Sequence, residues 1–282
     1  MRPDESEREE SFHAARLHVR EIPGTVQLRA GAGAAMRVRI TGSKKLVEQI
    51  ACRACGDLLH ISGPTRQTRV AVIDAGAGST RAHASVSGVS VTTVTTVTTS
   101  VHAAGADVVT SSRVITDHGE VVRIDSDAQA VEIVVDVPVH APITVEGAGG
   151  RYRIGDIEGR LDVRLNGIGE LIAGRIATGH VDLSGASRVQ IVAVDGPELR
   201  VRISGTGELT VREGHVEDLI VTVTDAGKAI FGGVATRADL SASATGSIRI
   251  NQVTASLVER QEGLSRISVH GPPRRDPDSF WA

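Results

Sequence analysis

Between Pro142 and Pro273, apolar and polar residues recur in a block of roughly nineteen to twenty residues that is repeated about six or seven times. Each block has two segments in which every second residue is apolar, the pattern of a strand with one buried face. The first segments carry Leu161, Val163, Leu165, Val181, Leu183, Leu199, Val201, Ile203, Leu219, Val221, Val223, Ala238, Leu240 and Ala242. The second segments carry Leu171, Ala173, Val189, Ile191, Leu209, Val211, Ala229, Phe231, Ile248, Ile250, Ile267 and Val269. A third apolar position follows at Ile176, Val194, Val216, Val234 and Val253.

The corners between the two segments are small and often contain glycine, as in Asn166–Gly169, Ser184–Ser187 and Ser204–Gly207. Glycine tolerates positive φ, so tight bends are favourable there. Because the blocks are nearly constant in length, stacked coils would place equivalent residues above one another at about 4.8 Å. The sequence predicts an all-β fold, a right-handed parallel β-helix (solenoid) of coils of about 19–20 residues with irregular N-terminal strands. An antiparallel sandwich with glycine-rich turns is the alternative.

The rest of the chain is less regular. Residues 1–12 and 274–282 are predicted to be flexible tails that flank one β-helical domain over 13–273. Within that domain, irregular strands and a Thr-rich insertion reach to about 130, and regular coils occupy 131–273. Ser43–Cys52 predicts a short helical turn or a loop. The Thr-rich segment 86–101 is compatible with loosely paired strands or with a loop. Pro272 and Pro273 are expected to end coil stacking because proline has no amide hydrogen to donate.

Charge and composition narrow the possible partners. The first ten residues contain five acidic residues and two arginines, and so carry the whole net charge of −3. The remainder is neutral overall, which argues against nucleic acid as a partner. No segment approaches the ~18 consecutive apolar residues that a membrane helix needs. The charged start, Met1–Glu10, does not resemble a signal peptide, so the default expectation is the cytoplasm.

The corner sequences resemble a known family. Leu199–Leu209 and Val181–Ala186 are similar to the Ser-Gly-x-Gly repeats of the head GIN domain of “putative auto-transporter adhesins”. The resemblance extends to Val26–Pro64, similar to the entry strands of that family, to Val131–Pro138, and to the coils over 142–273. It implies a β-helical domain without an assigned biochemical role, and an adhesin-like location in the cell envelope or at the surface.

Candidate chemical groups are scattered. Asp162, Asp182, Glu208, Asp218, Asp225 and Asp239 fall in different columns, whereas glycan-cleaving β-helices need clustered carboxylates. The aromatic residues that could form a sugar platform are Phe12, Tyr152, Phe231, Phe280 and Trp281. Ten histidines show no metal-binding spacing, and His180 and His215 are expected at solvent-facing coil corners. Gly147–Gly150 lacks the following helix that a phosphate loop would need.

Cys52 and Cys55 have the spacing of a redox pair or of half a zinc site, with His60 as a conceivable third ligand. A closed zinc site needs four ligands, so two thiols packed in a cap are the favoured interpretation. A redox role for this pair stays open. The sequence therefore predicts no catalytic residues, no metal site and no cofactor.

The leading hypothesis is a non-catalytic, adhesin-like structural or interaction module that binds a protein or glycan partner. The alternative is a cytoplasmic self-assembling β-helical scaffold similar in principle to bactofilin filaments. A polysaccharide lyase or hydrolase is the third. The oligomeric state is left open.

Overall fold

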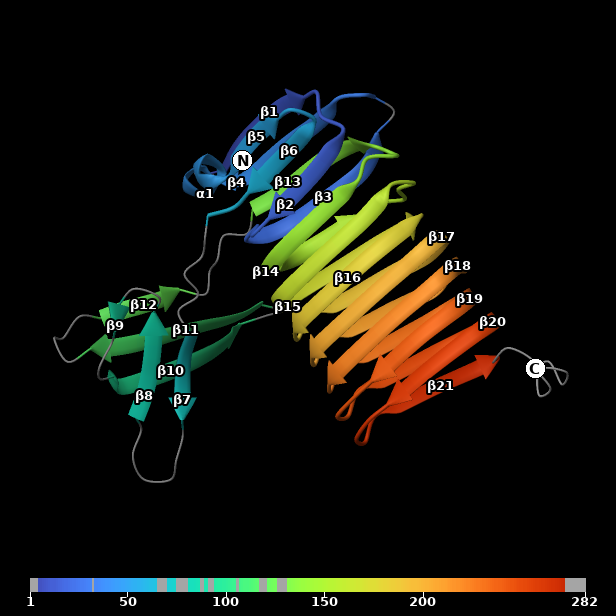
Figure 1. Cartoon of the computed structure of the whole chain (residues 1–282). Helices are drawn as coiled ribbons and strands as arrows, with labels where there is room; N and C mark the ends of the chain where they lie inside the picture. Colours follow the sequence, from blue (N-terminus) through green and yellow to red (C-terminus); the bar gives the residue numbers. More distant parts are fainter. Residues whose placement is uncertain are drawn as a thin grey trace, which may run out of the picture. The chain divides into compact units, whose positions relative to one another are not determined.

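The computed structural model describes residues 5–31, 33–64, 70–74, 81–86, 89–90, 94–104, 107–116, 121–125 and 131–271 (Figure 1). Side chains are described for 6–31, 33–64 and 131–271. By internal contacts the chain divides into two compact units, residues 1–64 together with 130–282, and residues 65–129. The prolines 272 and 273 and the expected tail 274–282 lie outside the described residues.

The larger unit is a β-solenoid of about seven turns. Its strands are β1 (Glu5–Phe12), β2 (Arg16–Arg20), β3 (Gly24–Gly31), β4 (Met36–Ser43), β5 (Ala51–Cys55), β6 (Leu58–Ser62), β13 (Val131–Pro138), β14 (Ile143–Ile154), β15 (Arg160–Ile176), β16 (Thr178–Gly185), β17 (Arg188–Gly205), β18 (Glu208–Asp225), β19 (Lys228–Ala242), β20 (Ser247–Gln261) and β21 (Arg266–Gly271). From β14 to β21 every pairing between neighbouring coils is parallel (Figure 1). The predicted solenoid is confirmed, and the antiparallel sandwich is wrong for this unit.

The interior is filled by the two columns that the alternation predicts. Val163, Val181, Val201 and Val221 lie in register on successive coils and are each at most 2% exposed. Leu171, Val189 and Leu209 do the same in the second column. One predicted position is wrong by a residue. Ala235, and not Val234, pairs with Val216 and Val253 and is fully buried, because the register shifts between Val211 and His215.

The corners are held by glycine backbone and by a buried hydroxyl group. Gly205 has φ +114°, and a Cβ there would lie 2.9 Å from the Gly185 carbonyl oxygen of the coil below. Ser187 is 1% exposed, donates a hydrogen bond to the Gly167 carbonyl at 2.9 Å and accepts one from the Gly169 amide at 3.2 Å. The hydroxyl thus links two successive corners, which fixes the path of the chain there.

The N-terminal end of the solenoid has a dedicated cap. β1 pairs antiparallel with β4, and α1 (Lys44–Gln49) lies between β4 and β5 and buries Val47. The short helical turn predicted at Ser43–Cys52 is confirmed. Arg8 of β1 donates to the Ile50 carbonyl at 2.9 Å, which ties the edge strand to the end of the helix.

The prediction of a flexible tail over 1–12 is wrong for residues 5–12, which form β1. The physical reason is that the backbone pairs with β4 along all eight residues and Phe12 packs against the core. Arg39 of β4 lies 3.2 Å from Glu7 and 3.5 Å from Glu9, so the acidic residues face a basic partner. A charged edge also discourages pairing with other chains.

On the cap's outer face two imidazole rings meet. His60 of β6 and His18 of β2 are in register, with ring centroids 4.8 Å apart and perpendicular planes. His18 Nε2 lies 3.3 Å from a Glu146 carboxylate oxygen. Burial, then the neighbouring charges of His18, Arg20 and Arg53, lower the pKa of His60 despite the opposing effect of Glu146.

The smaller unit is a six-stranded antiparallel sheet of β7 (Val70–Asp74), β8 (Arg81–Val86), β9 (Val89–Ser90), β10 (Val94–Ala104), β11 (Asp107–Thr116) and β12 (Val121–Asp125). The described part of the Thr-rich segment 86–101 belongs to β8, β9 and β10. β10 pairs with β11 over its whole length apart from one irregularity between Val94 and Thr96. This segment is therefore built as paired strands.

Replacement of an inward residue by a charged one should destabilise the solenoid. Val201→Asp places a carboxylate between the Val181 and Val221 side chains, with an expected loss of about 3 kcal/mol or more in the free energy of unfolding. Arg200→Asp, on the neighbouring outward position, should cost less than about 1 kcal/mol. Urea denaturation measures both, and equal losses would contradict the inward assignment.

The corner hydroxyl group should contribute measurably to stability. Ser187→Ala removes the acceptor of the Gly169 amide and the donor to Gly167, so we expect a loss of about 1–3 kcal/mol. Thr206→Ala, at the equivalent corner of the next coil, changes an exposed side chain and should stay within about 0.5 kcal/mol. Similar values for the two variants in urea denaturation would show that the hydroxyl does not secure the corner.

The cap should lose stability on acidification. Because the pKa of His60 in the folded state is below 6.5, its value in an unfolded chain, the unfolded state binds more protons. This contribution is complete above pH 6.5 and is lost as the pH falls through the folded-state pKa. The urea midpoint should therefore drop between about pH 7.5 and pH 5.5. His60→Gln should reduce this drop, whereas the exposed His270→Gln should leave it unchanged. An equal pH dependence in all three proteins would contradict the assignment.

Candidate functional site

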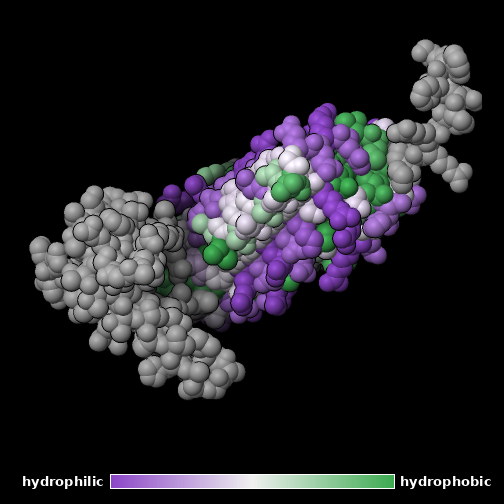
Figure 2. Space-filling view, turned by 90° about the horizontal axis from the view of Figure 1, so that it is seen from below, coloured by the Kyte–Doolittle hydropathy of each residue, from purple (hydrophilic) through white to green (hydrophobic). Residues whose placement is uncertain are grey.

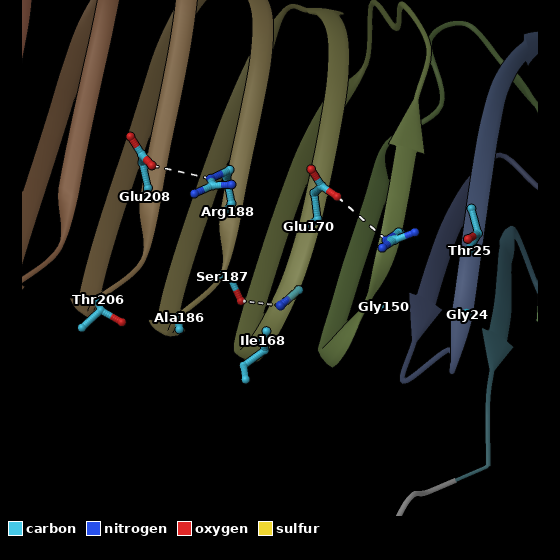
Figure 3. Close-up of a pocket in the computed structure, with 12 residues that line it drawn as sticks. Gly24, Thr25, Gly150, Ile168, Glu170, Ala186, Ser187, Arg188, Thr206 and Glu208 are labelled. Atoms are coloured by element: carbon cyan, nitrogen blue, oxygen red, sulfur yellow. Dashed lines mark hydrogen bonds and ion pairs between the residues drawn. The ribbon is translucent and has the colours of Figure 1, made fainter. Parts of the chain in front are cut away.

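A surface depression of the solenoid runs along the coil corners (Figure 3). It has a volume of about 550 Å³ and crosses five successive strands, from β3 through β14, β15 and β17 to β18. We call it the corner groove. Its residues are Gly24, Thr25, Gly150, Arg151, Ile168, Gly169, Glu170, Ala186, Ser187, Arg188, Thr206 and Glu208.

Small residues produce the depression. Gly150, Gly169 and Ala186 leave space at successive corners, and the Ser187 hydroxyl group is turned inward by its hydrogen bonds to Gly167 and Gly169. Ile168 is the exception, because its side chain is 81% exposed at the corner of β15. The groove therefore combines a narrow polar trough with one projecting apolar side chain.

A line of alternating charges follows the groove from coil to coil. Arg151, Glu170, Arg188, Glu208 and Lys228 occupy one outward register position on β14, β15, β17, β18 and β19. Arg188 Nε lies 3.6 Å from Glu208 (Figure 3). Arg151 Nε lies 4.0 Å from Glu170, and Lys228 Nζ donates to Glu208 at 2.9 Å. We call this line the charge ladder.

Basic neighbours keep Glu208 of the ladder ionised, and the arginines of the ladder are accessible. The hydrogen bond from Lys228 is the largest effect on Glu208, and with Arg188 it outweighs burial and lowers the pKa of the carboxyl group. Arg151 and Arg188 are 73% and 60% exposed, and ion pairs of this kind contribute little to stability. These side chains can therefore exchange their present partners for polar groups of a ligand at small cost.

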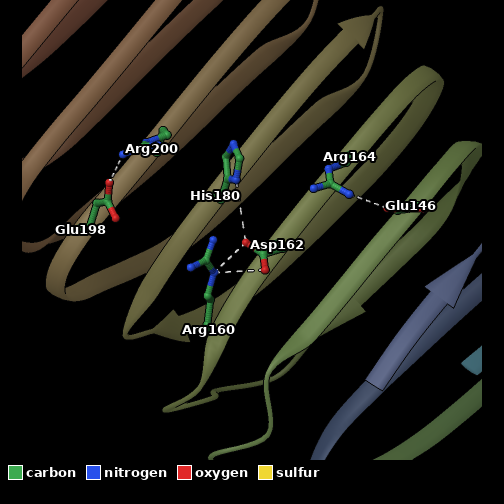
Figure 4. Close-up of polar contacts among 7 residues, drawn as sticks. All are labelled: Glu146, Arg160, Asp162, Arg164, His180, Glu198 and Arg200. Atoms are coloured by element: carbon green, nitrogen blue, oxygen red, sulfur yellow. Dashed lines mark hydrogen bonds and ion pairs between the residues drawn. The ribbon is translucent and has the colours of Figure 1, made fainter. Parts of the chain in front are cut away.

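A second group of ion pairs lies on the outer face of β14, β15, β16 and β17 (Figure 4). Arg164 donates to Glu146 at 2.7 Å, and Arg160 to Asp162 at 2.9 Å. Burial alone would raise the pKa of Glu146, but Arg164 and His18 outweigh it and the pKa is lowered. The Glu146 carboxylate is thus held ionised by its basic neighbours.

The acidic residues that the sequence shows as scattered are mostly paired in space. Asp162 lies 4.0 Å from His180, Asp218 pairs with Arg237 at 2.5 Å, and Asp239 pairs with Arg260 at 2.6 Å. The partners are roughly one block apart in sequence. That spacing, applied to outward positions, is the signal that could have found these pairs and the charge ladder. His180 was expected at a corner but lies within β16, whereas His215 is exposed as predicted.

Cys52 and Cys55 both belong to β5 of the cap. They are three positions apart, so their side chains lie on opposite faces of the strand. Cys52 is half-buried, and burial raises the pKa of its thiol to about 11, whereas Cys55 is exposed. The expectation that both thiols are packed is therefore wrong for Cys55, because it lies near the exposed end of an edge strand.

Two of the predicted aromatic candidates belong to the core. Tyr152 is 1% exposed and Phe231 is 3% exposed. The Tyr152 hydroxyl donates to the Gly149 carbonyl at 3.2 Å, and burial raises the pKa of Tyr152 to about 12. A Cβ on Gly147 would lie 2.6 Å from that hydroxyl, so the glycine-rich corner makes room for the ring. Phe280 and Trp281 lie outside the described residues.

Among the described residues, no group of three or more His, Cys, Asp or Glu side chains could hold a metal ion. No helix in the described part of the chain is long and apolar enough to cross a membrane.

Comparison with solved structures supports the architecture. A “putative adhesin” from Parabacteroides merdae is 9% identical, with a TM-score of 0.56, 95% of this chain covered and 97% of the other. One from Parabacteroides distasonis is 10% identical, with a TM-score of 0.54 and 95% of each chain covered. One from Bacteroides fragilis is 12% identical, with a TM-score of 0.52 and coverage of 95% and 97%. At these identities the similarity shows the fold alone.

No curated protein matches the sequence. A family model does match, over residues 177–270, which is the stretch from the end of β15 to β21. Its description is “Putative auto-transporter adhesin, head GIN domain”. These coils contain Ser184–Gly185 and Ser204–Gly207, the corners on which the resemblance was predicted. The coils over residues 177–270 therefore match the model of the head GIN domain family, and the predicted resemblance is confirmed.

Proposed function

We propose that this protein is a non-catalytic, adhesin-like interaction module that binds an extended polar partner along the corner groove. The observation that carries the proposal is the charge ladder, an accessible line of Arg151, Glu170, Arg188, Glu208 and Lys228 on five stacked strands. The family match over residues 177–270 supports the adhesin-like class.

The electrostatics favour binding over glycan cleavage. A glycoside hydrolase needs a carboxyl group that is protonated near neutral pH, which requires a raised pKa. In Glu146 and Glu208 the pKa is shifted downward. Ionised carboxylates beside arginines are suited to hydrogen bonding with a ligand.

The groove has the dimensions of a site for a linear partner. Parallel coils follow one another at about 4.8 Å, so the five strands that line it present a nearly regular row of donors and acceptors. The row is mounted on hydrogen-bonded strands, which hold the backbone of the binding residues rigid before any partner arrives. Preorganisation of this kind reduces the entropic cost of binding.

The scaffold alternative is less well supported. End-to-end stacking needs a free strand edge at both ends, and the N-terminal end carries α1 and the charged strand β1.

Charge reversal in the groove tests the proposal. Beads coated with the full chain would be applied to printed glycan arrays and to immobilised extracellular-matrix proteins. We expect retention on at least one class of surface, with a decrease at high salt because the contacts are exposed ion pairs. Arg151→Glu combined with Arg188→Glu should reduce retention by about tenfold or more.

Arg200→Glu is the matched control, because Arg200 is similarly exposed and pairs with Glu198 outside the groove. It should retain binding. Equal retention by the groove variant and the wild type would contradict the assigned surface, and absence of retention on every surface would contradict the adhesin-like function.

A further inference from the structure

The outward column of residues that carries the charge ladder continues beyond Lys228. Ser247 of β20 lies in register with Lys228, and Arg266 of β21 lies in register with Ser247. Arg266 is exposed, as are Arg151 and Arg188. The column therefore extends along the solenoid from β14 to β21. We call it the ladder column.

Positive charges occupy every second coil of the ladder column. Adjacent strands are about 4.8 Å apart, so successive cations are spaced by about 9.6 Å and the first and last lie about 29 Å apart. The coils between them carry a carboxylate, which accepts hydrogen bonds, or a hydroxyl group. The cations are Arg151, Arg188, Lys228 and Arg266, and the residues between them are Glu170, Glu208 and Ser247.

The row of cations has a defined beginning. On the N-terminal side of Arg151, the next residues in register are Thr25 of β3 and Glu132 of β13. The position two strands before Arg151 is thus the exposed, acidic Glu132, where continuation of the pattern would require a cation. An anionic group of a ligand would be repelled there. The row is therefore limited to the four cations from β14 to β21.

The surface that carries the row is polar, and its backbone is rigid. Hydrophilic residues cover most of the solenoid face seen in Figure 2. Glu170, Arg188 and Glu208 project from neighbouring strands on one side of the sheet (Figure 3). These strands pair in register with their neighbours, so the spacing of the charges is set before a ligand binds. Such a row selects a ligand by the spacing of its charges.

The spacing fits a polysaccharide better than a peptide. In an extended peptide, side chains on one face repeat at about 6.6–6.8 Å, so successive acidic side chains would not meet successive cations of the row. The disaccharide unit of an extended polysaccharide is close in length to the two-coil spacing. A polymer in which a uronic acid alternates with an uncharged sugar presents one carboxylate per disaccharide. Three of the four cations are arginines, whose guanidinium group matches a carboxylate in geometry.

The acidic residues in the row add selectivity. A polymer with a charge on every sugar would place anions beside Glu170 and Glu208, and like charges at an interface are unfavourable. The pKa of Glu208 is lowered, chiefly by the hydrogen bond from Lys228, so this carboxylate keeps its charge at neutral pH. An uncharged sugar in the same place can donate its hydroxyl groups to these carboxylates. The row therefore favours alternating over uniform charge.

We propose that the ladder column binds an acidic polysaccharide in which uronic acids and uncharged sugars alternate, with one carboxylate at each of its four cations. This inference rests on the function proposed above and specifies the partner. Four disaccharide units occupy the whole row, and the two glutamates and the serine contact the sugars between the carboxylates.

Binding of hyaluronan oligosaccharides tests the inference, because hyaluronan has this alternating structure. Oligosaccharides of two to six disaccharide units would be titrated into the full chain at constant salt. Affinity should rise about two- to fivefold with each unit up to four, since each adds one exposed ion pair, and should then level off. Hyaluronan with its carboxyl groups reduced to alcohols should bind at least about tenfold more weakly, and so should polygalacturonate of equal length, which has a carboxylate on every sugar.

Arg266→Glu shortens the row of cations at its C-terminal end. Affinity in this variant should level off at three disaccharide units in place of four. Arg260→Glu is the matched control, because it makes the same change of charge at an exposed arginine of β20 that pairs with Asp239 in a different outward column. The control should keep the increase up to four units.

Three results would overturn the inference. These are equal binding of hyaluronan and its carboxyl-reduced form, tighter binding of polygalacturonate, and a length dependence that Arg266→Glu leaves unchanged. The proposed function would still stand if Arg151→Glu combined with Arg188→Glu abolished binding of the preferred polymer. Absence of binding to all three polysaccharides would also overturn the inference, whereas salt-sensitive retention on a matrix protein that the same double variant abolishes would leave the corner groove as a binding site.

Discussion

In-register parallel stacking of coils is the constraint on which the rest of this structure depends. Once Val163, Val181 and Val201 lie above one another, each coil must have nearly the same length, because one extra residue would turn the inward set outward. Departures from this block length are accommodated within single coils. Where the register shifts between Val211 and His215, Ala235 takes the inward position in place of its neighbour Val234.

The same constraint arranges the outer surface. A side chain at an outward position meets only its neighbours one coil above and below, so opposite charges at this spacing become ion pairs without any further design. Arg237 with Asp218 and Lys228 with Glu208 are examples. The interior makes the fold uniform along its axis, and the surface is free to vary. Function in such a molecule depends on which outward residues lie in register on successive coils. The charge ladder, which runs beside the small corner residues, is the longest set of this kind that we describe.

The contrast between a uniform interior and a variable surface explains which parts of the structure could be predicted from the sequence. The inward columns were predictable because alternation and block length both depend on burial, which the sequence records directly. The corner groove was not, since it arises from small residues such as Gly150 and Ala186 in different coils, and their alignment requires the exact register. β1 was missed for another reason. Its acidic residues indicate a tail when considered alone, and the strand forms because its backbone pairs with β4, which is distant in the sequence and places Arg39 beside Glu7 and Glu9. The ion pairs between neighbouring coils could have been predicted from the sequence, because the two partners are separated by one block.

The ends of a solenoid present a problem that the repeat cannot solve, since the first and last coils have only one neighbour. At the N-terminal end the solution is a helix, an antiparallel strand and ion pairs, which bury Val47 and Ile50 and leave a charged edge. At the other end the last coil changes its own inward residues to Glu259 and Gln261 on one side but keeps Ile267 and Val269 on the other. A polar substitution prevents further stacking but does not shield apolar neighbours from water. The two requirements are separate, which is why this half-polar end still leaves Ile267 and Val269 only partly buried.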